Sequence, residues 1–176
     1  MTMKRLTPYL ISVLLGALHT VPALSQTCND SIPASAPNSR YEVLTDDSEV
    51  LDKQTQLVWQ RCSIGHSWDG AACTGTAAQY NWKDALAAAE SLGNGYRLPN
   101  FKELFSLVEA KCFDPAINTD IFPDTLNFYF WSSSPYLDVI EADNSVWCMN
   151  FQDGQLVAGC YKGAEGLYVR AVRANR

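Results

Sequence analysis

The chain has 176 residues, with 19 acidic and 13 basic side chains and a formal net charge of −6 at neutral pH. This acidic balance argues against nucleic acid as a partner and makes a polyanionic ligand electrostatically unfavourable. A chain of this length predicts one globular domain.

Residues 1–25 have the pattern of a secretory signal peptide. Lys4 and Arg5 precede an apolar run from Leu6 to Leu24, and small residues come before Gln26. The run is short and no second one follows, so we expect a cleaved leader and no transmembrane segment in the product. Loss of two basic residues with the leader makes the net charge about −8. The product is expected to be secreted or periplasmic.

All six cysteines follow the leader, and an even number in an exported chain predicts three disulfides. Six cysteines allow 15 connectivities and sequence alone does not fix one, but spacing favours Cys62–Cys73 and Cys148–Cys160, which leaves Cys28–Cys112. The first pair closes a short Gly-rich loop, the second crosses a Gln-Asp-Gly-Gln turn, and the third is the remainder. A turn symmetric about Gly154 puts the second pair directly opposite each other, whereas another register needs a bulge. The third pair is expected to join the N-terminal segment to the end of a second helix.

Residues 26–40 are rich in Ser, Pro and Ala, which predicts a loose tether, and residues 41–176 are expected to form the domain. Residues 113–129 are expected to be irregular, because they combine prolines with several Asn and Asp residues. Alternating or β-branched runs predict strands over residues 41–44, 49–51, 57–62, 130–133, 145–151, 155–160 and 168–173.

Two helices are expected, from about Trp82 to Leu92 and from about Phe101 to Ala110. Asn81 is the predicted N-cap of the first helix, and Asn100 that of the second. Their apolar stripes are Trp82, Ala85, Leu86 and Ala89 in the first, and Phe101, Leu104, Phe105 and Val108 in the second. Two helices beside antiparallel strands and long loops predict an α+β fold.

The connection between the helices is expected to be scaffold. Pro99 fixes its own φ, and Glu103 stands three residues after Asn100, which is a capping-box spacing. Arg97 and Glu103 flank the turn and are expected to pair across it. We therefore assign Arg97, Pro99 and Glu103 a structural role.

Four short motifs carry a family resemblance: RLPNxKEL at 97–104, DPAIN at 114–118, FWSSS at 130–134 and VRAVR at 169–173. Their order and spacing resemble the Lcl C-terminal domain family, a bacterial domain formerly of unknown function, over about residues 41–173. The resemblance implies a fold related to C-type lectins and to the formylglycine-generating enzyme. It also implies an exported or envelope-associated protein, and the adhesin that gives the family its name binds sulfated polysaccharides.

Catalysis is not expected. His66 is the one histidine after the leader, it lies in a Gly-flanked loop expected on the surface, and no His-Glu-x-x-His zinc motif occurs. Three disulfides would leave no thiolate. The acidic segment from Asp138 to Asn144 has oxygen ligands that suit Ca²⁺, but it has neither the Glu-Pro-Asn or Gln-Pro-Asp tripeptide of sugar-binding lectins nor an EF-hand pattern. A solvated acidic loop is favoured over a calcium site, and no cofactor is expected.

Aromatic residues divide into two predicted groups. Trp59, Trp82, Trp131 and Trp147 lie on regular elements and are expected mostly in the core, whereas Trp68 and three tyrosines lie on loops or element ends. The ligand is expected to approach residues 127–144 and the surroundings of Tyr161. The predicted contacts are Tyr129, Tyr136, Asp138, Asp143, Asn144 and Tyr161.

The predicted function is recognition of a neutral glycan or of a cell-surface or envelope protein. If a sulfated polysaccharide binds, Lys162 and Arg176 are expected to carry it. One alternative is a divergent enzyme on the scaffold of the formylglycine-generating enzyme, and another is a structural surface domain that self-associates. The sequence leaves the oligomeric state open.

Overall fold

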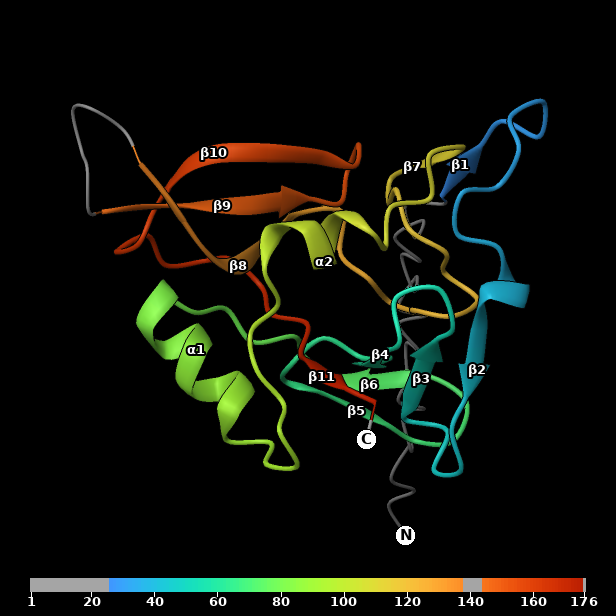
Figure 1. The fold of residues 1–176 in the computed structure, drawn as a ribbon, viewed down its shortest axis with the longest axis horizontal. Helices are drawn as coiled ribbons and strands as arrows, with labels where there is room; N and C mark the ends of the chain where they lie inside the picture. Colours follow the sequence, from blue (N-terminus) through green and yellow to red (C-terminus); the bar gives the residue numbers. More distant parts are fainter. Residues whose placement is uncertain (1–25, 138–143, 176) are drawn as a thin grey trace, which may run out of the picture.

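The computed structural model describes residues 26–137 and 144–175, and the predicted leader lies outside them. Figure 1 shows a three-stranded sheet on one side of the molecule, a four-stranded sheet on the other, and helix α1 beside them. The elements in chain order are β1 (Thr27–Cys28), the 3-10 helix η1 (Asn38–Arg40), β2 (Tyr41–Val43), β3 (Glu49–Asp52), β4 (Leu57–Gln60), β5 (His66–Trp68), β6 (Cys73–Gly75), α1 (Trp82–Glu90), α2 (Phe101–Phe105), β7 (Cys112–Phe113), β8 (Tyr129–Tyr136), β9 (Ser145–Asn150), β10 (Gln155–Tyr161) and β11 (Val172–Ala174).

All strand pairs are antiparallel, which together with the two helices confirms the α+β class. The larger sheet has the order β11-β4-β3-β2 and the smaller one β10-β9-β8, while β1-β7 and β5-β6 form two short ribbons. The ribbons were not predicted, because strands of two or three residues are too short to show a period of two. No helix in the described residues is long and apolar enough to cross a membrane.

Strand β8 separates two hydrophobic clusters. Successive strand side chains point to opposite faces, so Phe130 enters one cluster and Trp131 the other. The first cluster contains Trp59, which pairs with Val50 on β3 and with Val172 on β11. The second lies between β8 and α1. Strand β8 therefore lies between the two clusters and contributes a buried side chain to each.

Helix α1 begins as predicted, with the Asn81 side chain accepting a hydrogen bond from the Asp84 N–H at 3.0 Å. The predicted length of α2 is wrong, because the helix ends at Phe105 rather than at Ala110. The Ser106 hydroxyl donates back to the Glu103 carbonyl at 2.7 Å. The next two backbone N–H groups, of Leu107 and Val108, then bond to carbonyls three residues back, which is the hydrogen-bond pattern of a 3-10 helix.

The predicted scaffold between the helices is confirmed. Asn100 and Glu103 form a complete capping box, in which the Glu103 carboxylate accepts from the Asn100 N–H at 2.7 Å. The Arg97 guanidinium also donates to both Glu103 oxygens, at 2.7 and 2.8 Å. The backbone of Arg97 pairs with that of Val172, so the turn is tied to the larger sheet.

The three predicted disulfides are present. Cys28 and Cys112 face each other across β1 and β7, so this bond ends on a strand after α2 rather than on the helix itself. Cys62–Cys73 ties β6 to the end of β4. Cys148–Cys160 links β9 and β10. These two cysteines are not register partners, because the hairpin contains the bulge that a non-symmetric turn requires.

Residues 26–40 have little regular structure, but they are not loose. Ala36 is completely buried in the first core cluster, and its N–H donates to the Glu109 carboxylate at 2.9 Å. The Gln26 amide donates to two carbonyls of the segment after β7. Buried backbone groups that find specific partners hold this segment on the domain.

The predicted strand over residues 168–173 is reduced to β11, because its first half bonds elsewhere. Tyr168 exchanges backbone hydrogen bonds with β8, through the Tyr129 carbonyl and the Trp131 N–H, each at 3.0 Å. Val172 then pairs with Trp59 on β4. The segment leaves one sheet and joins the other, so its backbone connects them.

Arg170, at the middle of this segment, is completely buried, and no carboxylate in the described residues pairs with it. Its guanidinium donates to the carbonyls of Gln60, at 2.9 Å, and Arg61, and to the Thr125 hydroxyl at 2.7 Å. It also lies over the Phe122 ring. Burial lowers the pKa of Arg170 to about 9, which leaves the side chain charged at neutral pH.

Replacement of Arg170 by Met should lower the free energy of unfolding by about 2–4 kcal/mol, since buried carbonyls and a buried hydroxyl lose their donor. Chemical denaturation with the disulfides intact measures this loss. Lys111→Met is the control, because Lys111 pairs with the exposed Asp30 at 3.1 Å and its loss should cost about 1 kcal/mol or less. If the two variants lose equal free energy of unfolding, the hydrogen bonds of the buried guanidinium stabilise the fold no more than an exposed ion pair does.

Candidate functional site

Aromatic side chains gather where the start of α2 meets the end of β8. The Trp147 ring stacks on Phe101, with ring centroids 5.4 Å apart and an interplanar angle of 28°. Tyr136 meets the same indole edge to face at 5.1 Å. All three rings are half-buried, so each keeps a face or an edge in solvent. We call Phe101, Phe105, Tyr136, Leu137 and Trp147 the aromatic surface.

Local structure fixes the position of these rings. The Asn100 cap begins α2 at Phe101, whose N–H also donates to the Ser134 hydroxyl of β8 at 3.1 Å. An irregularity in the β8–β9 register lies between Trp131 and Pro135, and such bulges redirect the residues that follow. Helix start and strand end are therefore held at a fixed distance by the scaffold.

Two members of the aromatic surface are strongly exposed. Phe105 stands one helical turn after Phe101 and is 52% exposed, and Leu137 follows Tyr136 and is 80% exposed. Phe105 also borders a shallow hollow of about 300 Å³ that continues toward Val108 and Arg40. Large apolar side chains that gather at the surface of a domain indicate a contact site.

The structure separates the predicted contact residues. Tyr129 and Tyr136 lie at opposite ends of β8, and the Tyr129 ring packs against Phe128. Tyr136 and Tyr161 are both register partners of Ser145, so they share one end of the smaller sheet. Tyr161 is 54% exposed.

Other predicted contacts lie at the same end or cannot be placed. Asn144 is exposed, and its carbonyl accepts from the Lys162 N–H at 2.8 Å. The Lys162 ammonium lies over the Trp82 ring at 4.8 Å. Asp138, Asp143 and Arg176 lie outside the described residues.

The predicted division of the tryptophans is partly wrong. Trp59 and Trp131 are completely buried, as expected, but Trp82 and Trp147 are only partly buried. The sequence assigned Phe101, Phe105 and Trp147 to the core by their periodicity. A helix of five residues buries little of its stripe, and Leu104 is the one fully buried member of α2. The length of a helix therefore decides how much of its stripe is covered.

His66 was expected on the surface and instead begins β5, where it is half-buried. Its Nδ1 atom is buried and has no hydrogen-bond partner in the described part of the chain. Trp68, on the same strand, was expected to be an exposed contact and is covered by the Arg61 guanidinium at 4.1 Å. Residues 26–137 and 144–175 contain no group of three or more His, Cys, Asp or Glu side chains close enough to hold a metal ion.

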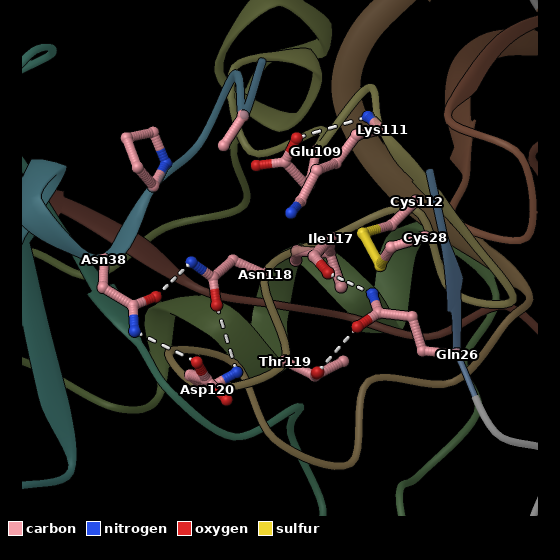
Figure 2. A pocket seen from close by; sticks show the side chains of 12 residues that line it. Gln26, Cys28, Asn38, Glu109, Lys111, Cys112, Ile117, Asn118, Thr119 and Asp120 are labelled. Atoms are coloured by element: carbon pink, nitrogen blue, oxygen red, sulfur yellow. Dashed lines mark hydrogen bonds between the residues drawn. A yellow bond between two sulfur atoms is a disulfide. The ribbon is translucent and has the colours of Figure 1, made fainter. Parts of the chain in front are cut away.

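A pocket of about 340 Å³ lies between the N-terminal segment and the residues around β7, and Figure 2 shows its lining. Its polar side chains bond to one another: Thr119 donates to Gln26 at 2.9 Å, Asn118 to Asn38 at 2.6 Å, and Asn38 to Asp120 at 3.0 Å. Groups already paired in this way are less available to a ligand. The pocket is best explained as the seam that holds residues 26–40.

Glu109 closes the inner side of this seam. Its carboxylate is almost fully buried and accepts hydrogen bonds from the N–H groups of Ser35, Ala36 and Lys111. Burial opposes ionisation, but these backbone donors outweigh it and lower the pKa of Glu109 below its ordinary value.

One protein family matches the chain. The model of the Lcl C-terminal domain covers residues 48–173, which include both helices, the three-stranded sheet and the larger sheet except β2 and the last residue of β11. No curated protein and no solved structure matches the chain.

Replacement of Glu109 by Gln should lower the free energy of unfolding at neutral pH by about 1–3 kcal/mol, because the amide presents only one acceptor oxygen to these donors. A carboxylate with a lowered pKa stabilises the fold above its unfolded pKa and loses this effect as the pH falls through the folded value. The difference between the wild type and Glu109→Gln should therefore shrink below about pH 4.

Denaturation at pH 7 and at about pH 3 tests this, with Glu42→Gln on the exposed strand β2 as the control. The control should change stability little at either pH. A Glu109→Gln loss that is the same at both values would contradict the role of the charge.

Proposed function

Because the chain belongs to the Lcl C-terminal domain family, we propose that it is an extracytoplasmic, non-catalytic module that recognises a glycan or a protein surface. The finer assignment, a C-type-lectin-like scaffold in a secreted or envelope-associated protein, is part of the same proposal. The observation that carries it is the aromatic surface, where Trp147 stacks on Phe101 and Phe105 is left open to solvent.

Such a surface suits recognition for two physical reasons. Aromatic rings present a large contact area at low conformational-entropy cost, since two torsions fix the side chain. Their faces also accept the C–H-rich faces of sugar rings, and their edges pack against apolar protein side chains. The rings here belong to a helix and two strands, so they are ordered before a ligand arrives.

The charge of the chain favours a neutral partner. Lys102 places an ammonium over the aromatic surface, 5.9 Å from the Phe101 ring centre. The chain as a whole is acidic. Sulfated chains would meet repulsion over most of the molecule.

A binding role is also favoured over the enzyme alternative. All six cysteines are paired in disulfides, so thiol chemistry of the formylglycine-enzyme type has no free cysteine to use. Three disulfides are typical of proteins that work outside the cytoplasm.

A glycan array, read with and without calcium, tests the proposal together with two matched substitutions. Phe105→Ala and Tyr136→Ala should each weaken binding to any glycan that the wild type binds on the array by about tenfold, because each removes part of the contact surface. Phe113→Ala is the control, since Phe113 is 50% exposed but lies on β7, away from the aromatic surface.

If Phe113→Ala weakens glycan binding as much as the other two variants, binding depends on exposed apolar area in general and not on the aromatic surface. If no glycan binds, surface plasmon resonance measures binding of the wild type and the same three variants to envelope proteins, which tests recognition of a protein surface. Gel filtration of the wild type and Phe105→Ala checks self-association, which would appear as a dimer or larger species that the substitution dissociates.

A further inference from the structure

The hollow beside Phe105 joins an apolar wall to a polar one. Its volume of about 300 Å³ lies at the lower end of the range of small-molecule sites. Phe105, Val108 and Ala110 form the apolar wall, and the Phe105 side chain is open to solvent. The polar wall comes from η1 and from the turn between β3 and β4, and it includes Arg40 and Thr55.

Arg40 lines this hollow with one nitrogen unpaired. Its side chain is only 9% exposed, because Nε donates to Asp52 Oδ1 at 2.8 Å and Nη2 pairs with the other Asp52 oxygen. Nη1 has no hydrogen-bond partner within residues 26–137 and 144–175. A donor that is left over on so well-held a side chain favours a ligand that brings an acceptor.

Asp52 also decides which kind of acceptor fits. Its side chain is completely buried, and it compensates the charge of Arg40 at contact distance. A sulfate group would therefore gain little from the guanidinium, in a chain whose net charge is already negative. The remaining donor suits a neutral oxygen such as a hydroxyl or a carbonyl.

Two hydroxyls of the lining are left as acceptors, because their protons are already engaged. Thr55 Oγ1 donates to Asp52 Oδ2 at 2.6 Å, and Ser106 Oγ donates to the Glu103 carbonyl at 2.7 Å. Each oxygen keeps lone pairs that can accept from an N–H group of a ligand. The hollow thus offers one donor, two acceptors and an apolar wall.

We propose that this hollow binds the acetamido group of an N-acetylhexosamine residue, with the sugar ring over Phe105. The acetamido carbonyl accepts from Arg40 Nη1, and its N–H donates to the hydroxyl of Thr55 or Ser106. The methyl group packs against the apolar wall, and the C–H face of the sugar covers the open Phe105 ring. This assignment rests on glycan recognition by the aromatic surface, and it adds the class of sugar.

Other groups at this position fit less well. The hydroxyl of a plain hexose reaches the guanidinium but leaves the apolar wall uncovered. A protonated amino sugar brings donors to a donor, because an ammonium has no lone pair to accept from Arg40. A peptide amide shares the carbonyl and the N–H, but the flat C–H face that stacks on Phe105 is a feature of pyranose rings.

Isothermal titration calorimetry tests the assignment with two trisaccharides that have the same linkage. Triacetylchitotriose carries an acetamido group on each ring, and cellotriose carries a hydroxyl at the same position. The wild type should bind triacetylchitotriose at least about tenfold more tightly, because the hydroxyl lacks the methyl contact and the carbonyl acceptor. Equal affinity for the two, or no binding of triacetylchitotriose, overturns the proposal.

Two substitutions in the lining should reduce this preference. Ala110→Leu fills the hollow from an exposed position and should weaken triacetylchitotriose at least about tenfold, whereas Ala71→Leu, an exposed control between β5 and β6, should not. Arg40→Lys keeps a positive charge beside Asp52 but removes Nη1, so the two trisaccharides should then bind alike. Melting temperatures show that the variants are folded, and Ala110→Leu decides if Arg40→Lys is not.

The results separate this assignment from the function proposed for the aromatic surface. If Phe105→Ala weakens both trisaccharides and Ala110→Leu weakens neither, the aromatic surface binds glycans and the role of the hollow is overturned. The same holds if the glycan array retains other sugars while triacetylchitotriose does not bind. Weakening by Ala71→Leu as large as that by Ala110→Leu also overturns it.

Discussion

The buried guanidinium of Arg170 is the interaction on which the rest of the structure depends. It donates to the carbonyls that end β4 and to the Thr125 hydroxyl, and these groups come from distant parts of the chain. A buried charge normally needs an opposite charge, but here neutral oxygens and the Phe122 ring take that role. The residues on either side of Arg170 then bond to different sheets, so one side chain holds the crossing point of the fold.

This crossing point explains how the two core clusters are joined. Tyr168 exchanges backbone bonds with β8, and Val172 packs beside Trp59 in the larger sheet. The Arg97–Glu103 turn is tied to the same segment through the backbone of Val172. The start of α2, and with it Phe101, is thereby fixed relative to β8. The aromatic surface is a consequence of this arrangement rather than of any single loop.

Strand β8 carries two chemically different regions at its ends. The end at Tyr136 is aromatic and apolar, while the end at Asn127 adjoins a cavity with two carboxylates and an imidazole. The aromatic end rests on β8, β9 and α2, so a ligand there meets groups that are already placed. Preorganisation lowers the entropic cost of binding, which matters most for weak, surface-exposed contacts.

Local signals in the sequence determined much of this protein: the helix caps at Asn81 and Asn100, the Arg97–Glu103 pair, the class of fold and the disulfide pairs. The caps and the ion pair join residues near in sequence, the fold class follows from the order of predicted elements, and two disulfide pairs follow from cysteine spacing, which leaves Cys28–Cys112 as the third. Tertiary structure alone decided the early end of α2, the attachment of residues 26–40 and the partial exposure of Trp147. It also placed Asp114, Asp124 and His66 around one cavity. Such outcomes depend on which distant segment covers a side chain, and the periodicity of one segment carries no information about its neighbours.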